Sequence, residues 1–160
     1  MALTNVYGNN YNDAYVESPQ TKIHQGERGG RVKVMYESFT FDADGAASET
    51  VYLGRLPKGA KVLSARVFGP DLGGTGTSEL GNSASVDGSA TDAADVDAFI
   101  DAIDHSGQAF DVSDSASSQR GPAIGLVRFS TEVNVIWTLT GATSGATSKI
   151  VYMILTYVVD

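Results

Sequence analysis

The stretch Tyr52–Gly69 reads Y-L-G-R-L-P-K-G-A-K-V-L-S-A-R-V-F-G, a pattern typical of a strand, a tight turn and a second strand. Pro57 fixes φ at the first corner of the turn, and Gly59 can adopt the positive φ that a third corner often needs. The second half alternates with a period of two, so it predicts a strand in a hairpin-like corner. Its expected apolar row is Leu63, Ala65 and Val67, alternating with Val62, Ser64 and Arg66.

Strands are expected on both sides of this corner. In residues 31–41 the apolar parity changes near Glu37, which predicts a bulge or a bend inside that strand. Alternation over residues 133–139 predicts a half-buried strand, and Gly- and Ser-rich loops separate the elements. The chain therefore predicts an all-β sandwich over residues 31–160, preceded by an extended arm over residues 1–30.

One short helix is expected in this otherwise β-rich chain. Thr91 suits an N-cap, and the following apolar residues have the i, i+3, i+4, i+7 spacing of a helix packed on a sheet. Three acids would then share its solvent side, which we interpret as a solvated face rather than a metal site. The apolar stripe is Val96, Phe99, Ile100 and Ile103, and the acids are Asp97, Asp101 and Asp104.

The last strand, Lys149–Val159, is apolar on both faces. Burying each large side chain is worth about 1.5 to 3 kcal/mol, so exposing a whole face would forfeit much of the stability of a domain. One face belongs to the core, and the other needs a helix, the arm or another subunit. We therefore expect self-association, most simply as a closed symmetric oligomer. The predicted oligomer interface is the row Val151, Met153, Leu155 and Tyr157.

The arm is rich in Asn and Gly but also carries aromatic and apolar residues, which predicts a segment that orders against a surface. That surface is either its own domain or a partner, and an extended strand could pair with a partner's sheet edge. The residues expected to make this contact are Tyr7, Tyr11, Tyr15, Lys22, Arg28 and Arg31.

Charge and missing motifs exclude several classes of function. The net charge is −8, and no Lys or Arg lies between Gly69 and Arg120, so a nucleic-acid partner is not expected. The chain has no cysteine, no signal peptide pattern and no apolar run of membrane-spanning length. His24 and His105 stand alone, and no nucleophile elbow or phosphate loop occurs. We therefore predict a non-enzymatic protein without cofactor, metal, membrane or small-molecule substrate.

Several segments in this order carry a family resemblance: N-V-Y-G-N-N-Y, G-G-R-V-K-V-M-Y-E, L-G-R-L-P-K-G-A-K-V-L-S-A-R-V, S-E-L-G-N-S, D-A-A-D-V-D-A-F-I and the apolar carboxy-terminal strand. The chain resembles the head-decoration (cement) proteins of tailed bacteriophages from Leu3 to Val159. The resemblance implies a jelly-roll-like β-sandwich and a homotrimer. It also implies a location on the outer capsid surface, after synthesis in the host cytoplasm, where the protein stabilises contacts between major capsid subunits.

With that resemblance, the arm residues become candidates for contact with the major capsid protein. The competing hypothesis is a carbohydrate- or receptor-binding sandwich of a phage tail or fibre. Such a module would present aromatic residues together, as Tyr7, Tyr11 and Tyr15 could do with their spacing of four.

Overall fold

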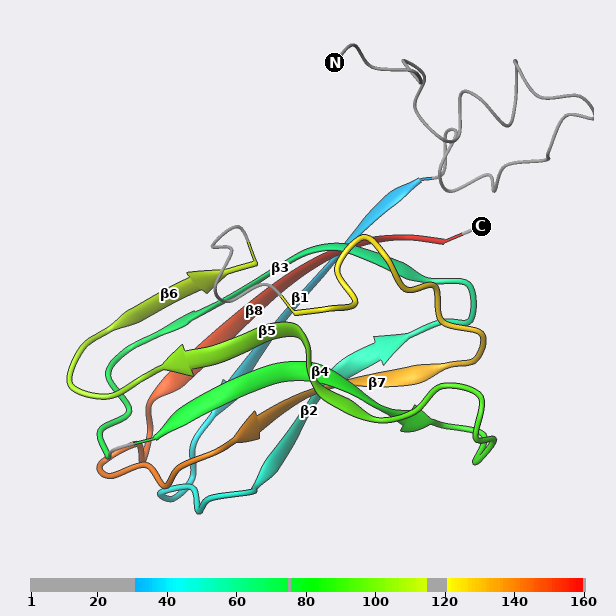
Figure 1. Cartoon of the computed structure of the whole chain (residues 1–160). Helices are drawn as coiled ribbons and strands as arrows, with labels where there is room; N and C mark the ends of the chain where they lie inside the picture. Colours follow the sequence, from blue (N-terminus) through cyan, green and yellow to red (C-terminus); the bar gives the residue numbers. More distant parts are fainter. Residues whose placement is uncertain (1–30, 75, 115–120, 160) are drawn as a thin grey trace, which may run out of the picture.

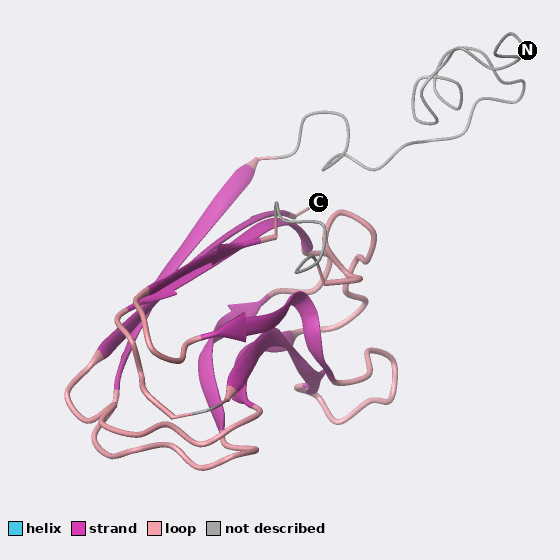
Figure 2. Cartoon of the chain, turned by 60° about the vertical axis from the view of Figure 1, so that its left-hand side comes forward, coloured by secondary structure: helices cyan, strands magenta, loops and turns pink. Residues whose placement is uncertain are grey.

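In the part of the chain that the structure describes, eight β-strands form two four-stranded antiparallel sheets that pack face to face (Figures 1 and 2). The computed structural model describes residues 31–74, 76–114 and 121–159. Sheet A has the order β1-β8-β3-β6 and sheet B the order β2-β7-β4-β5. The predicted all-β sandwich is confirmed. The strands are β1 (Val32–Thr40), β2 (Thr50–Leu56), β3 (Lys61–Gly69), β4 (Thr77–Ser85), β5 (Asp95–Asp104), β6 (Phe110–Ser113), β7 (Val133–Leu139) and β8 (Ile150–Val158).

The strands pair from the two ends of the domain inward: β1 with β8, β2 with β7, β3 with β6 and β4 with β5. Further pairing of β8 with β3 and of β7 with β4 completes the sheets. The chain thus resembles a long antiparallel ribbon rolled up so that β1, β2 and β3 lie in alternating layers. This topology brings segments far apart in sequence onto one surface.

The stretch 52–69 forms the two expected strands and the expected turn. Gly59 has φ +83°, and the amide of Ala60 donates to the carbonyl of Pro57 at 3.1 Å. The strands do not pair with each other, because β2 joins sheet B and β3 joins sheet A. The predicted hairpin-like corner is therefore a crossing between layers.

The core lies between the two sheets and is built from the inward rows of both. Trp137 of β7 is fully buried and meets Phe41 edge to face, with ring centroids 5.8 Å apart. Such aromatic contacts stabilise a core beyond the burial of area alone. Other fully buried side chains are Leu56, Val62, Val67, Leu80, Phe99, Ile100, Ile103, Val133, Val135 and Leu155.

The predicted helix is wrong, because its residues form strand β5. Ser78 lies opposite Ile103 and Leu80 opposite Ile100, so β5 carries one more residue than β4 between these pairs. Ala102 takes up this extra residue with φ +52°. A bulge of this kind turns two residues three apart toward the same face. It therefore reproduces, within a strand, the spacing that predicted a helix.

A second irregularity in β5 depends on a glycine in β4. Between the pairs Leu80–Ile100 and Asn82–Asp95, β5 carries several extra residues. A Cβ atom on Gly81 would lie 2.0 Å from the carbonyl oxygen of Asp95. Only glycine allows the two backbones to approach so closely.

The parity change in β1 has a different cause from the expected one. The register with β8 is continuous from Val32–Val158 to Thr40–Ile150, so of the two predicted irregularities near Glu37 a bulge is excluded. Apolar side chains instead occupy both faces of β1. The bulge lies in β3, where the register with β8 shifts between Val62 and Ser64. It exposes Leu63 and buries Val62, unlike the predicted row.

Candidate interaction surface

Strand β8 has two apolar rows, and the structure shows which one faces the core. Val151, Met153 and Leu155 are buried between the sheets, and Tyr157 is half-buried and packs against the core. These four residues were the predicted oligomer interface. The first three are already covered within the domain, so an interface on β8 has to use the opposite row.

That opposite row belongs to an apolar surface on the outer side of sheet A, which we call the apolar face. In β1, Val34 and Tyr36 expose 65% and 60% of their surface. The register places Tyr36 opposite Ile154, and Phe68 of β3 opposite Tyr152. The face is therefore continuous across three neighbouring strands. Its members are Val32, Val34 and Tyr36 of β1, Ile150, Tyr152 and Ile154 of β8, and Phe68 of β3.

Three aromatic rings form a row across this face. The ring centroids of Tyr36 and Tyr152 are 6.1 Å apart, and those of Tyr152 and Phe68 are 5.3 Å apart, with interplanar angles of 28° and 18°. Rings that pack against each other in this way restrict each other's side-chain motion. A contact made through them would lose little side-chain entropy.

An ion pair borders the aromatic row. The guanidinium of Arg66 lies 5.3 Å from the ring centroid of Phe68. Its Nε and Nη2 donate to the two carboxylate oxygens of Asp111 at 2.7 and 2.5 Å. The guanidinium holds the pKa of Asp111 below its usual value, and the pair adds no net charge to the surface.

The outer side of sheet B has a different character along its β4–β5 edge, which we call the acidic edge: Glu79, Asp95, Asp97 and Asp101. A hydrogen bond with the Asp97 side chain, with burial second, raises the pKa of Asp95 to about 6. Burial, with the charges of Asp97 and Asp101, raises the pKa of Glu79. No described group of three or more acidic or histidine side chains is arranged to hold a metal ion. Asp97, Asp101 and Asp104, which were predicted to share one face of a helix, lie instead in the edge strand β5.

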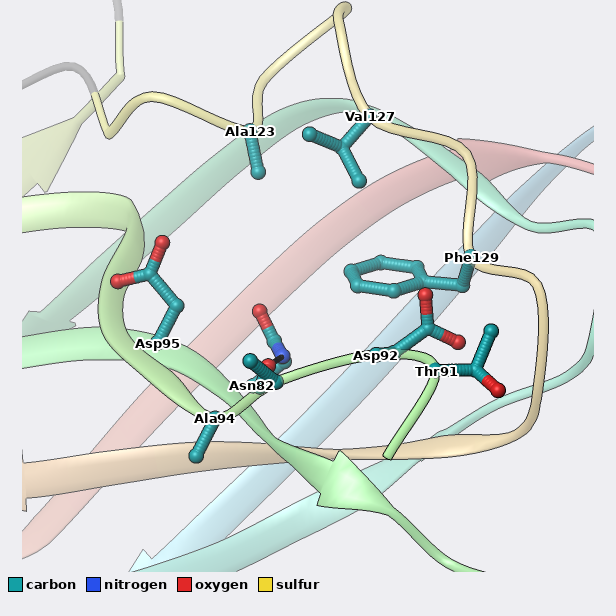
Figure 3. Close-up of a pocket in the computed structure, with 9 residues that line it drawn as sticks. Asn82, Thr91, Asp92, Ala94, Asp95, Ala123, Val127 and Phe129 are labelled. Atoms are coloured by element: carbon teal, nitrogen blue, oxygen red, sulfur yellow. Dashed lines mark hydrogen bonds between the residues drawn. The ribbon is translucent and has the colours of Figure 1, made fainter. Parts of the chain in front are cut away.

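A cavity of about 350 Å³ opens beside the β4–β5 connection (Figure 3). Asp92 in its wall accepts the amide of Thr131 at 2.7 Å and the amide of Ser130 at 3.2 Å. Asn82 donates to the carbonyls of Ser83 and Ala93, both at 2.9 Å. These hydrogen bonds hold two loops together. The polar side chains in the cavity wall therefore have a structural role. The other lining residues are Thr91, Ala94, Asp95, Ala123, Val127 and Phe129.

Most of the predicted arm contacts lie outside the described residues: Tyr7, Tyr11, Tyr15, Lys22 and Arg28. Arg31 is exposed directly before β1. His105, which stands alone in the sequence, is fully buried, and its ring centroid lies 6.4 Å from that of Phe110. Its burial among core residues fits a structural role.

No described helix is long and apolar enough to cross a bilayer. No family model and no curated protein matches the sequence. Among solved structures, a chain of the capsid of Ralstonia phage GP4 matches with a TM-score of 0.65 and 25% identity, covering 82% of this chain and 86% of that one. A chain of the cyanophage Pam1 capsid asymmetric unit matches with a TM-score of 0.64 and 19% identity, covering 91% and 99%. This chain therefore shares its fold with phage capsid proteins.

Proposed function

We propose that this chain is a virion structural protein that binds the outside of a phage capsid and stabilises contacts between major capsid subunits. The carrying observation is the match to the Ralstonia phage GP4 capsid, at 25% identity over 82% of this chain. The resemblance of the sequence to decoration proteins supports the outer position. In this role the protein is not an enzyme, and its partner is the major capsid protein.

The strand order supports a jelly roll as the finer description of the fold. A jelly roll places eight strands in two sheets through two Greek keys, and it is common in viral capsid proteins. The nested pairs β1–β8, β2–β7, β3–β6 and β4–β5 agree with that arrangement. A rigid sandwich of this kind holds its surfaces in fixed relative positions, as a clamp between subunits requires.

Attachment is assigned to residues 1–30 together with Arg31. An extended segment can add a strand to a sheet edge of the shell and place alternate side chains in pockets. Ordering each backbone residue costs about 1 to 2 kcal/mol, so a long arm needs a large contact surface. A shell of many subunits offers such a surface. In a homotrimer, three arms would act together, and their combined affinity would far exceed that of one arm.

A carbohydrate- or receptor-binding role is less well supported. Sugar recognition by a β-sandwich needs aromatic faces left open to the ligand. On the apolar face, Tyr152 is stacked between Tyr36 and Phe68, so its ring faces are occupied within the chain. This packing favours contact with protein.

Binding to shells assembled from the major capsid protein of the same phage tests the proposal. We expect the chain to sediment with the shells and to raise the temperature at which they come apart. A chain lacking residues 1–25 should melt at nearly the same temperature as the full chain but lose shell binding. Full occupancy by the shortened chain would contradict the attachment role of the arm. Failure of the full chain to bind would contradict the virion role.

A further inference from the structure

The partner of the apolar face follows from its chemistry and its surroundings. We propose that the apolar face is the surface through which copies of this chain pack against each other. The proposal depends on the virion role in one respect only: copies of this chain meet each other before they meet a capsid. It assigns the self-association expected from the two-faced last strand to a defined set of residues.

The composition of the face is the first argument. Interfaces between permanently associated copies are more apolar than interfaces between proteins that also exist apart. The apolar face combines Val34, Tyr36 and Ile154 with two further aromatic rings. Contiguous exposed apolar patches mark contact sites in proteins that stay dispersed in water.

Charge is the second argument. Each copy carries a formal charge of −8, so two copies repel through most of their surface. Contact through the acidic edge would bring Glu79 and Asp97 of both copies together and raise that repulsion. On the apolar face the border charges of Arg66 and Asp111 cancel each other. Contact through the apolar face therefore brings fewer like charges together than contact through the acidic edge.

Order of assembly is the third argument. A decoration protein meets its shell only after the shell exists, whereas another copy of the same chain is present from synthesis onward. A face this apolar needs cover throughout that time, and a second copy provides it.

The geometry favours packing by the face over pairing by the edge. β1 is the edge strand of sheet A, and its inward row carries the exposed charges of Lys33 and Glu37. Inward-pointing charges on an edge strand are a common protection against the addition of another strand. The outward row of Val32, Val34 and Tyr36 carries no charge. The contact is therefore expected between the faces of two sheets, with the aromatic row near its centre.

Light scattering on the full chain at micromolar concentration, with matched variants, tests the proposal. Tyr36→Glu places a charge on the apolar face in edge strand β1. Tyr52→Glu makes the same change on the outer side of sheet B, in edge strand β2, at a residue that is 69% exposed. We expect the unaltered chain and Tyr52→Glu to have a multiple of the 16.7 kDa mass of one chain. Tyr36→Glu should raise the dissociation constant about a hundredfold, as loss of a central interface residue does.

Val34→Glu is the second variant, because it removes no ring contact and leaves the stack of Tyr36 and Tyr152 intact. It should dissociate the oligomer as Tyr36→Glu does, and circular dichroism should show that both variants remain folded. A one-chain mass for the unaltered protein would overturn the proposal, as would equal dissociation by Tyr52→Glu, or association that survives both β1 variants. A chain that self-associates through this face but binds no shell would contradict the virion role alone.

Discussion

The pKa values of acidic residues shift in opposite directions on the two outer faces of the sandwich. On sheet A, Asp111 is paired with Arg66, and its pKa is lowered. On sheet B, the pKa values of Asp95 and Glu79 are raised. The causes are burial and neighbouring acids, and no cation contributes to either shift. One face is apolar with its charge neutralised, and the other keeps its charge at a cost to stability. This difference agrees with the proposed contact between copies on sheet A.

The largest predicted effect separates the inner from the outer row of β8. Leu155→Ala removes a fully buried side chain and should lower the free energy of unfolding by about 2 to 5 kcal/mol. Ile154→Ala, one residue away on the apolar face, should cost less than about 1.5 kcal/mol in the dissociated chain. Urea unfolding of both variants at one low protein concentration measures the contrast. Equal losses would mean that the outer row is also covered within a single chain.

The second effect is a rise in stability on mild acidification. The pKa of Asp95 in the folded chain, about 6, lies above its ordinary value of 3.8, so the folded state binds a proton more tightly than the unfolded state. The destabilisation is fully present well above pH 6 and is relieved as the pH falls through 6 toward the ordinary value of 3.8. The lowered pKa of Asp111 acts in the other direction, because its stabilisation is lost as the pH falls below about 4.

The melting temperature should therefore be highest between about pH 4 and 5. Asp95→Asn should raise the free energy of unfolding at pH 7 by about 1 kcal/mol, after allowance for solvent screening, and should flatten the profile between pH 7 and 5. Asp42→Asn, an exposed residue away from the acidic edge, changes the net charge equally and serves as the control. An equal gain from the control would assign the effect to net charge instead of the pair with Asp97.

The smallest effect compares one ion pair on each sheet. Arg66 binds Asp111 through two hydrogen bonds beside Phe68, whereas Arg55 contacts Glu132 at 2.9 Å on sheet B. Both pairs are about half exposed, so their coupling energies should be small. Double-mutant cycles in urea should give a small favourable coupling for the first pair and a weaker one for the second. A stronger coupling between Arg55 and Glu132 would contradict the expectation that the Arg66–Asp111 pair is the better ordered of the two.

Sequence reasoning was most successful where one local rule acts alone. The turn at Pro57 and Gly59 was predicted because each residue has a conformational preference that its neighbours do not oppose. The strands on either side were predicted from their alternation. Their assignment to different sheets was missed, because that choice depends on pairing with β7 and β8, more than seventy residues away in sequence.

Parity explains the two main errors. In β5, the bulge at Ala102 gave a strand the spacing of a helix, and composition alone does not distinguish the two. In β8, both rows of side chains are apolar. The sequence pattern therefore does not show which row faces the core. The apolar face was predicted as a surplus surface, but on the wrong row. The exposed residues of β1 were the missed signal, since Val32, Val34 and Tyr36 continue the outer row of β8.

The position of β8 at the centre of sheet A also governs how the domain reaches its native state. Within the described chain, β4 and β5 are the one pair of hydrogen-bonded neighbours that follow each other directly in sequence. Every pairing in sheet A closes a long loop, and such closures lose chain entropy before any contact compensates for it. Folding rates fall as contacts become less local, and sandwiches of this kind fold in milliseconds to seconds. We therefore expect the β4–β5 hairpin to order early, and sheet A to form late and cooperatively when β8 inserts between β1 and β3.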